Sequence, residues 1–273
     1  MNAKVVMVQG TSSGAGKSTI VIALCRIFSN MGYKVSPFKA QNMSSKIHII
    51  SNVHRISKIQ AIQAFAARKE LEWQINPILL VPLGNNKSNV FVAGKFLEEM
   101  SAIKYYQEFV LAKGFPIVLD AVNKLKNEND IIIIEGAGSP AEINIAKYDI
   151  ANMLLAEKVN SPVLLVSDIE RGGCFASIYG TIKLLRLTKG FIINKFRGDE
   201  NILEDAIRFI EHSTNMINLG IIPKIEFFLP PEDSLDVIIN DNLKNIEKLY
   251  STRQLNEQID LLASSIENRL NLE

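Results

Sequence analysis

The sequence predicts an α/β fold built on a doubly wound, mostly parallel sheet. Uninterrupted apolar runs recur along the 273 residues, and several are separated by segments whose apolar residues repeat at helical spacing. Strands that are buried on both faces and alternate with helices are typical of parallel sheets with right-handed crossovers. Ligands of such sheets bind at the carboxyl ends of the strands. The runs expected to form strands are KVVMV, NPILLVPL, DIIIIEG, SPVLLVSD, KGFIIN and NLGIIP.

A glycine-rich stretch, GTSSGAGKST, joins the first expected strand to the first expected helix. Glycines let backbone N–H groups point inward at an anion, and the following helix presents its positive dipole end to the same place. A connection that binds nothing could also be rich in glycine, but Gly-Lys-Ser-Thr at a helix start favours a phosphate loop. The first glycine lies one residue early, with Thr11 in its usual place. The residues expected to hold a polyphosphate are Gly10, Thr11, Gly14, Ala15, Gly16, Lys17, Ser18 and Thr19.

The rest of the chain continues the alternation of strands and helices. A shorter element, NNKSNVFVAGK, is expected to form a turn and an edge strand attached to the main sheet. From about Asp241 the apolar residues are spaced by roughly three to five positions, which predicts one or two amphipathic helices packed on the core; a partner-binding arm is the alternative. We therefore expect one domain over residues 1–240 and a helical extension over residues 241–273. The other expected helices cover residues 59–67, 105–125, 150–158, 178–185 and 202–210.

Two side chains at strand ends are candidates for phosphoryl chemistry. Glu135 ends the run IIIIE at the sheet edge where the phosphate loop lies, and it can hold Mg²⁺ opposite Ser18; capping of the following turn is the alternative. The loop GAGSPAEIN that follows is expected to approach the γ-phosphate side. Lys39, just past the second expected strand, is a candidate cation for a transferring phosphoryl group, although most lysines are solvated surface residues.

Other polar residues near strand ends have more than one interpretation. Asp149 lies at an expected helix start, where an Asp is most often an N-cap. Asp168 and Arg171 follow a buried strand and either fix an anionic group or pair with each other. Asn194, at the end of KGFIIN, is placed to read a nucleotide base through its side-chain amide.

Composition restricts the classes of partner and compartment. With 30 basic and 29 acidic residues the formal net charge is +1, which gives no overall bias toward nucleic acid or an anionic membrane. Cys25 and Cys174 form neither a disulfide framework nor a metal cluster, and the three histidines lack metal-ligand spacing. No apolar run has the length of a membrane span, and the first strand leaves no room for a secretory signal. We expect a soluble cytoplasmic protein whose partners are small molecules.

The motifs together resemble a known family. They are similar, in order and in spacing, to the N-terminal synthetase domain of cobyric acid synthase over about residues 4–235. That family belongs with dethiobiotin synthetase, so the resemblance implies a P-loop NTPase fold that binds ATP and Mg²⁺ and activates carboxylates. The matching motifs are MVQGTSSGAGKS, PFKAQNMS, QAIQA, NPILL, EGAGSPAEIN, DIANM, DIERGGCFASIYGT, INKFRGD and LPPEDSL.

The resemblance also implies a reaction, the ATP-dependent amidation of corrinoid side-chain carboxylates. It converts adenosylcobyrinic acid a,c-diamide to cobyric acid in cobalamin biosynthesis. A carboxylate attacks the γ-phosphate, and ammonia then displaces phosphate from the acyl phosphate. Two lysines and Mg²⁺ would neutralise the charge that develops. The resemblance assigns catalytic roles to Lys17, Lys39, Glu135 and Asp149, metal binding to Ser18 and Glu135, and a role at adenine to Asn194.

Three departures from the family leave alternatives open. Family members usually continue into a glutaminase domain, so ammonia is expected here from solution or from a separate glutaminase subunit. Arg55 takes a position where the family usually has an acid, and Val81 and Leu83 replace lysines. The second interpretation is therefore a nucleotide-binding regulatory or partner protein that has lost amidation. A ParA-like dimerising ATPase is disfavoured, because Thr11 lies where those proteins have a lysine; a homodimer stays open.

Overall fold

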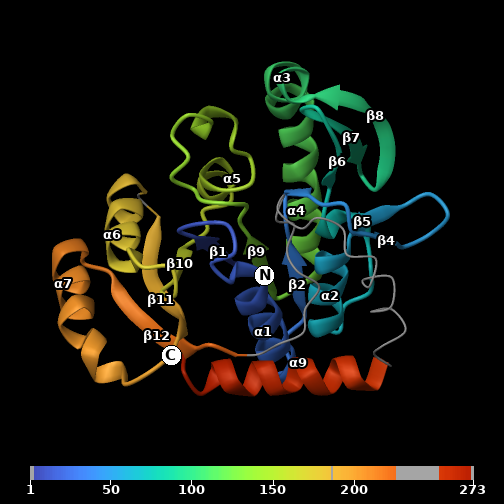
Figure 1. Cartoon of the computed structure of the whole chain (residues 1–273). Coiled ribbons are helices and arrows are strands. Elements are labelled where there is room, and N and C mark those ends of the chain that lie inside the picture. Colours follow the sequence, from blue (N-terminus) through green and yellow to red (C-terminus); the bar gives the residue numbers. More distant parts are fainter. Residues whose placement is uncertain (1–2, 186, 226–251, 272–273) are drawn as a thin grey trace.

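The computed structural model describes residues 3–185, 187–225 and 252–271 of the chain (Figure 1). Within these residues, six parallel strands form the main sheet in the order β12-β11-β10-β1-β9-β2. Because β1 lies between β10 and β9, the glycine-rich loop follows a central strand. The strands are β1 (Lys4–Gly10), β2 (Val35–Phe38), β9 (Ile131–Glu135), β10 (Val163–Asp168), β11 (Thr188–Phe196) and β12 (Ile217–Pro223).

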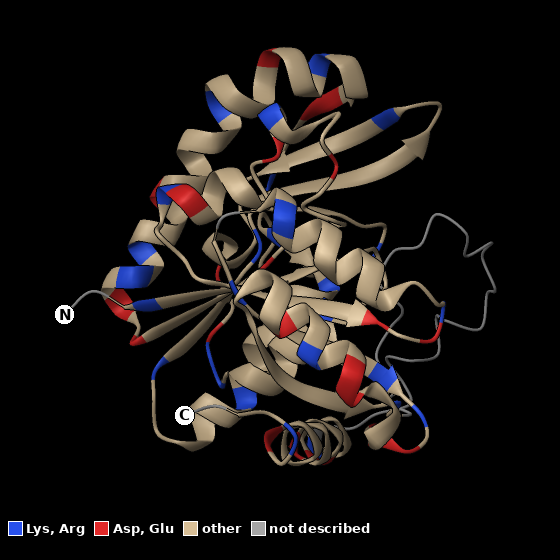
Figure 2. Ribbon diagram, turned by 90° about the vertical axis from the view of Figure 1, so that its left-hand side faces the viewer, with Lys and Arg blue, Asp and Glu red and all other residues tan. Residues whose placement is uncertain are grey.

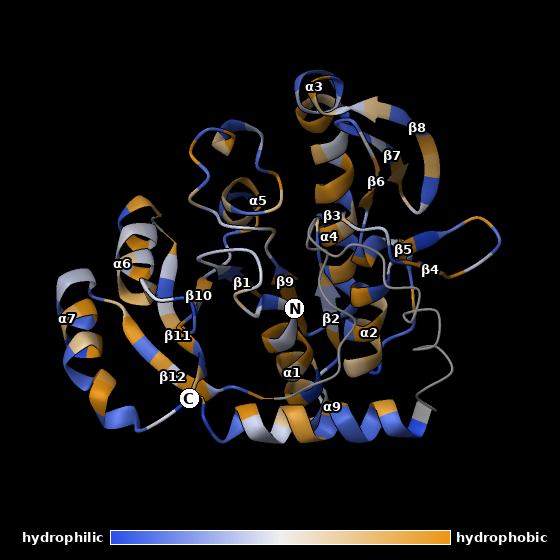
Figure 3. Cartoon of the chain, viewed as in Figure 1, coloured by the Kyte–Doolittle hydropathy of each residue, from blue (hydrophilic) through white to orange (hydrophobic). Residues whose placement is uncertain are grey.

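Helices cover both faces of the main sheet, because its strands present apolar side chains in both directions. Val8 and Ile133 pack on the face covered by α1, α2 and α9, whereas Met7 and Ile134 pack on the face covered by α4 and α5. In Figure 3 most of β12 and much of α1 have the hydrophobic colour. The predicted doubly wound class is confirmed. The covering helices are α1 (Lys17–Asn30), α2 (Lys58–Ala66), α4 (Phe115–Glu128), α5 (Met153–Lys158), α6 (Cys174–Leu184), α7 (Glu204–Thr214) and α9 (Thr252–Glu267).

The run NPILLVPL lies in a second sheet, so its expected place in the main sheet is wrong. This sheet has the order β3-β6-β7-β8, with β3 parallel to β6 and the other pairs antiparallel. The element NNKSNVFVAGK belongs to it as well, and not to the edge of the main sheet. Ile78, Leu79 and Leu80 are all buried, and so their run shows no alternation and looks like a strand of a parallel sheet. The strands are β3 (Gln41–Met43), β6 (Ile78–Gly84), β7 (Lys87–Val92) and β8 (Lys95–Ser101).

One continuous helical segment supports the second sheet, as the sequence predicted for residues 105–125. It begins as α3 (Ala102–Lys104), continues as the π-helical η2 (Tyr105–Gly114) and ends as α4. None of the described helices has both the length and the apolar character needed to cross a membrane. The remaining short elements are the hairpin of β4 (Ile47–Ile49) and β5 (Arg55–Ser57) and the 3₁₀ turns η1 (Trp73–Ile75), η3 (Ala146–Tyr148) and η4 (Glu200–Leu203).

The last described helix, α9, packs against α1 and lies below it in the view of Figure 1. Ile259 and Ile266 are fully buried in the same core cluster as α1. Arg26 of α1 donates from Nη2 to Oδ1 of Asn256 at 2.9 Å and pairs with Asp260 at 3.3 Å. This part of the extension is therefore a helix packed on the core, as expected. Residues 226–251, which hold the LPPEDSL motif and the expected domain boundary at 240, lie outside the described residues, so the division into two domains stays a prediction.

Charged residues of both signs are interspersed along the outer helices (Figure 2). In α7, for example, Arg208 pairs with Glu204 and Asp205 at 3.1 Å, and in the second sheet Lys87 pairs with Glu99 at 2.8 Å. Such exposed pairs contribute only about 0–1 kcal/mol each to stability. The fold therefore depends on its apolar layers, and the energetically important charges are the buried ones described next.

Candidate active site

The turn between β1 and α1 wraps the amino end of α1. Gly14 and Gly16 have φ angles of 71° and 104°, which side chains disfavour. A Cβ atom at Gly16 would lie 2.0 Å from Nδ2 of Asn194, so only glycine fits there. The hydroxyl of Thr11 lies 2.9 Å from that of Ser167 and anchors the start of the turn to β10. The result is a glycine-rich loop that leads into a helix N-terminus, the arrangement that suits phosphate binding.

Lys17 lies across this loop and is 1% exposed. Its Nζ donates to the carbonyl oxygens of Ser12 at 3.1 Å and of Gly138 at 3.0 Å. Gly138 belongs to GAGSPAEIN, the loop after β9. That loop therefore approaches the glycine-rich loop, and the lysine ammonium lies between the two.

Ser18, Lys39 and Gln63 all contact Glu135 at the end of β9. Glu135 is fully buried, and its Oε1 accepts from the Ser18 hydroxyl at 2.9 Å and from Lys39 Nζ at 2.6 Å. Gln63 of α2 donates from Nε2 to Oε2 of the same carboxylate. The structure thus brings together the serine, lysine and glutamate that the sequence singled out. It adds a glutamine that sequence reasoning missed.

Two side-chain amide atoms of α2 have no hydrogen-bond partner among the described residues. They are Oε1 of Gln63 and Nε2 of Gln60, and both side chains are fully buried. Gln60 does accept from Asn42 through its Oε1, at 2.7 Å. An unpaired buried polar atom costs about 1–3 kcal/mol, so the free oxygen of Gln63, whose Nε2 bonds Glu135, points to a bound group near that carboxylate. The signal in the sequence was QAIQA, with two glutamines three residues apart in an apolar helix.

The donor set fits one Mg²⁺ ion held together with phosphates. Within residues 3–185, 187–225 and 252–271, no group of three or more His, Cys, Asp or Glu side chains could hold a metal ion. Mg²⁺ instead commonly takes one or two carboxylates, several waters and substrate phosphates. Glu135 and Ser18 supply a carboxylate and a hydroxyl in contact with each other. The unpaired oxygen of Gln63 can accept a hydrogen bond from a water on such an ion.

Asn194 and Lys195 hold the glycine-rich loop from the end of β11. Asn194 donates from Nδ2 to the carbonyl of Ala15 at 2.8 Å, and Lys195 donates to a carbonyl one residue earlier at 2.7 Å. Lys195 also pairs with Asp168 at 2.7 Å. The alternative in which Asp168 pairs with Arg171 is therefore wrong, since the lysine of the neighbouring strand takes that carboxylate. Sequence reasoning missed Lys195, and a role of Asn194 at a base stays a prediction.

Asp149 lies in a turn ahead of α5, so its interpretation as the N-cap of that helix is wrong. Its carboxylate accepts from the Ala151 N–H at 3.2 Å and from Asn152 Nδ2 at 2.8 Å, while α5 begins only at Met153. Asn152 also bonds both backbone groups of Ala137, which ties the turn to the loop after β9. Burial raises the pKa of Asp149, and the hydrogen bonds from Asn152 and Ala151 lower that pKa in part.

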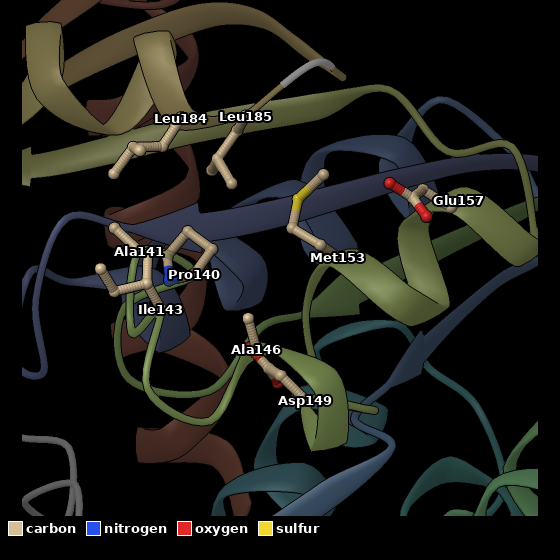
Figure 4. A pocket seen from close by; sticks show the side chains of 9 residues that line it. All are labelled: Pro140, Ala141, Ile143, Ala146, Asp149, Met153, Glu157, Leu184 and Leu185. Atoms are coloured by element: carbon tan, nitrogen blue, oxygen red, sulfur yellow. The ribbon is translucent and has the colours of Figure 1, made fainter.

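Asp149 lines a pocket of about 230 Å³ between the loop after β9, α5 and the end of α6 (Figure 4). Its walls are mostly apolar, as Ile143 and Leu185 illustrate, but Glu157 brings a second carboxylate. A larger pocket of about 400 Å³ lies between the second sheet and the segment α3–η2. The described residues therefore form at least two pockets: one with two carboxylates beside the loop after β9, and one beside the second sheet.

The residues that depart from the resembled family lie on or against the second sheet. The guanidinium carbon of Arg55 is 5.8 Å from the ring centroid of Phe91 on β7. Val81 and Leu83 lie on β6, where Leu83 is 51% exposed. The side-chain amide that bonds Glu135 belongs instead to Gln63 of α2.

Comparison with known proteins gives a consistent picture. The model of the CobQ/CobB/MinD/ParA nucleotide binding domain (CbiA) matches residues 6–231. "Probable cobyric acid synthase" of Thermococcus kodakarensis is 49% identical over 240 residues, which cover 85% of this chain and 49% of that protein. "Cobyric acid synthase" of Limosilactobacillus reuteri is 44% identical over 253 residues, which cover 91% and 50%. The chain spans about half the length of the curated relatives that it matches.

A solved structure with a similar fold is the signal recognition particle receptor FtsY from Elizabethkingia anophelis in complex with GDP. The TM-score is 0.51 at 14% sequence identity, and the match covers 95% of this chain and 64% of that one. At this identity the likeness shows the fold alone.

Proposed function

The chain belongs to the CobQ/CobB/MinD/ParA nucleotide-binding family, and from this premise we propose that it activates corrinoid carboxylates with ATP for amidation. The observation that carries the proposal is the buried cluster of Ser18, Lys39 and Gln63 around Glu135, next to the glycine-rich loop. Charge neutralisation supplies most of the catalysis in phosphoryl transfer, and this cluster holds the groups that neutralise charge. The name of the relatives supports the substrate class. The specific conversion is adenosylcobyrinic acid a,c-diamide to cobyric acid.

In the first proposed step an oxygen of the corrinoid carboxylate forms a bond to the γ-phosphorus of ATP. The bond from that phosphorus to the bridging oxygen breaks, which yields an acyl phosphate and ADP. Both reactants are anions, so their repulsion is a large part of the barrier. Lys17 would exchange its carbonyl contacts for phosphate oxygens, because hydrogen bonds between charged groups are the stronger ones. Lys39, which directly follows β2, would act on the transferring phosphoryl group as a second cation.

In the second step the nitrogen of ammonia attacks the acyl carbon. Phosphate leaves with the electron pair of the broken bond, and the nitrogen loses a proton, so the products are an amide, inorganic phosphate and a proton. We place Asp149 near the amidated group, where a carboxylate with a raised pKa suits acceptance of that proton. Ammonium in solution and a separate glutaminase subunit are both possible donors of this ammonia, and the chemistry at the acyl carbon is the same for any donor.

The metal and nucleotide contacts belong to the same proposal. Ser18 and Glu135 would hold Mg²⁺, which would supply further neutralisation of charge on the phosphates. Gln63 would keep the carboxylate of Glu135 oriented through the bond to Oε2. Asn194 would contact adenine while its Nδ2 supports the loop at Ala15. Two free, buried cysteines suit a reducing cytoplasm.

A second candidate is a nucleotide-binding regulatory or partner protein of the same family that has lost amidation. The observation in its favour is the set of departures at Arg55, Val81 and Leu83, where an acid and two lysines are replaced. Such a protein would keep the glycine-rich loop and bind ATP. It would not release phosphate faster when a corrinoid is added.

The deciding experiment combines the pure chain with ATP, Mg²⁺, ammonium and a corrinoid a,c-diamide. Mass spectrometry should show amides, each of which lowers the mass of the corrinoid by about 1 Da because nitrogen and two hydrogens replace oxygen and one hydrogen. Calorimetry with ATP runs in parallel. ATP binding without amides or corrinoid-stimulated phosphate release would favour the regulatory protein over the amidating enzyme.

A further inference from the structure

The structure contains a chamber that the proposed chemistry does not yet use. It is the pocket of about 400 Å³ between the second sheet and α3–η2, within the usual size range of small-molecule sites. Resting on the proposed function, we infer that this chamber receives the ring of the corrinoid, while the carboxylate to be amidated points toward Lys39. The inference assigns the place of the ring, which the reaction alone does not specify.

The walls of the chamber suit a flat, methylated macrocycle. Leu80 comes from β6, Met100 from β8, and Tyr105 and Tyr106 from η2. Aromatic rings and methionine side chains pack well on a conjugated ring and adapt to its methyl groups. The tyrosine rings are themselves arranged edge to face, with centroids 5.5 Å apart, so this wall is a packed surface.

The charges distinguish this chamber from the pocket of Figure 4. None of the described residues that line the chamber is acidic, and Asn85, Asn86 and Ser88 offer neutral hydrogen-bonding groups at the tip of the β6–β7 hairpin. The smaller pocket contains Asp149 and Glu157. A ring that bears several carboxylates would be repelled by two acids in a mostly apolar pocket, so the body of the ring favours the chamber and only the group being amidated comes near Asp149.

The chamber is connected to both halves of the proposed active site. The hydroxyl of Tyr105 donates to Oε1 of Gln41 at 2.6 Å, and Gln41 lies two residues after Lys39. The ring of Tyr106 lies 6.0 Å from that of Tyr148, the residue before Asp149. The four residues from Lys39 to the chamber wall at Met43 span at most about 14 Å. A macrocycle with pendant carboxylates can bridge such a distance.

The same placement accounts for two departures from the resembled family. Side chains alternate along β6, so Leu80 and Pro82 face the chamber while Val81 and Leu83 lie on the opposite face. Replacement of lysines at the latter two positions therefore leaves the chamber walls unchanged. Corrinoid binding is expected to persist in this chain.

The test compares two exposed alanines, one at each pocket. Ala102 lines the chamber and Ala146 lines the pocket of Figure 4, so tryptophan at either position obstructs one pocket without disturbing the core. Calorimetry with cobyrinic acid a,c-diamide, ATP and Mg²⁺ measures the affinity. We expect Ala102→Trp to raise the Kd for the corrinoid at least tenfold and Ala146→Trp to change it less than twofold. Both variants should bind ATP as the parent chain does.

A second measurement guards against a folding defect in the tryptophan variant. Ser88→Cys places a thiol in the chamber and Ala146→Cys places one in the other pocket, while Cys25 and Cys174 are buried and give little background. The corrinoid should slow maleimide labelling at position 88 at least fivefold and leave position 146 unchanged.

The possible results separate the inference from the function on which it rests. Weaker binding in Ala146→Trp with normal binding in Ala102→Trp would overturn the placement of the ring, as would equal labelling rates at position 88 with and without corrinoid. A parent chain that binds ATP but neither binds nor amidates the corrinoid would refute the proposed function itself.

Discussion

The edge of the main sheet around Glu135 and the chamber under the second sheet are built from different interactions. Around Glu135 the polar groups are buried and joined across β9, α1, α2 and the segment after β2. The chamber has apolar walls and a hairpin tip, and Lys87 on its lining pairs with Glu99 on the exposed side of the second sheet. On our proposals, phosphoryl chemistry would depend on fixed buried charges, whereas recognition of the ring would depend on the shape of the chamber.

The largest effect is expected at Lys17. We expect Lys17→Ala to lower kcat for amide formation about 1000-fold, because it removes a positive charge from the transferring phosphates. The fold should persist, since the change removes a charge contact and leaves the apolar layers intact; circular dichroism checks this. Lys113→Ala, at an exposed lysine of η2, is the matched control and should keep full activity. Turnover retained in Lys17→Ala would contradict the assigned role.

The second-largest effect is expected on stability, where the loss of a buried ion pair should cost more than the loss of an exposed one. Lys39→Met leaves the fully buried Glu135 without its cation, so we expect the free energy of unfolding at pH 7 to fall by about 3 kcal/mol. Lys87→Met breaks the exposed pair with Glu99 and should cost less than about 1 kcal/mol. Adding Glu135→Gln to Lys39→Met should recover part of the loss. Urea unfolding measures all of these, and equal costs at the two sites would remove the distinction between the regions.

A smaller effect is expected on the metal site. Gln63→Met removes the amide that holds Glu135, and we expect it to weaken Mn²⁺ binding in the presence of ATP about tenfold. Gln60→Met, at the other fully buried glutamine of α2, should change it less than twofold, because Gln60 bonds Asn42 instead. Electron paramagnetic resonance of Mn²⁺ gives the affinity, and ATP binding in EDTA controls for damage to the loop. Equal effects of the two changes would argue against a specific role of Gln63.

The smallest effect concerns Asp149 and depends on pH. Its pKa is raised by burial, so the folded state binds more protons there than the unfolded state does, and stability falls as the pH rises above the ordinary pKa of 3.8. Asp149→Asn removes this cost. Below that pH the variant should be as stable as the parent chain. As the pH rises, the variant should become slightly more stable than the parent, and thermal unfolding across pH 3–8 can measure this difference. A difference between variant and parent that shrinks with rising pH would show the opposite shift.

The parts that could be predicted from sequence are those set by local pattern. GTSSGAGKST between an apolar run and a helical repeat defines the loop and the start of α1, and the run IIIIE buries β9 and brings Glu135 to the sheet edge. Ile259 and Ile266 of α9 show the amphipathic spacing that packs this helix on the core. Each of these depends on neighbours within about ten residues, where periodicity is informative.

The missed features depend on contacts between distant segments. Gln63 and Glu135 are 72 positions apart, and nothing in QAIQA states which carboxylate the glutamine meets. The strand β6 looked like a parallel core strand because Ile78, Leu79 and Leu80 are buried on both of its faces, and only its partners reveal the second sheet. The prediction of Asp149 as a helix N-cap was wrong because a turn through Asn152 comes first, and α5 begins only at Met153.

The central claim is that the glycine-rich loop aligns ATP with a carboxylate so that the γ-phosphoryl group is transferred to a carboxylate oxygen. The most direct test uses a corrinoid a,c-diamide whose free carboxylates carry ¹⁸O, incubated with the chain, ATP, Mg²⁺ and ammonium. Mass spectrometry of the released phosphate measures the transfer. We predict one ¹⁸O atom in phosphate for each amide formed. Amide formation with unlabelled phosphate, or no corrinoid-dependent phosphate at all, would contradict the account.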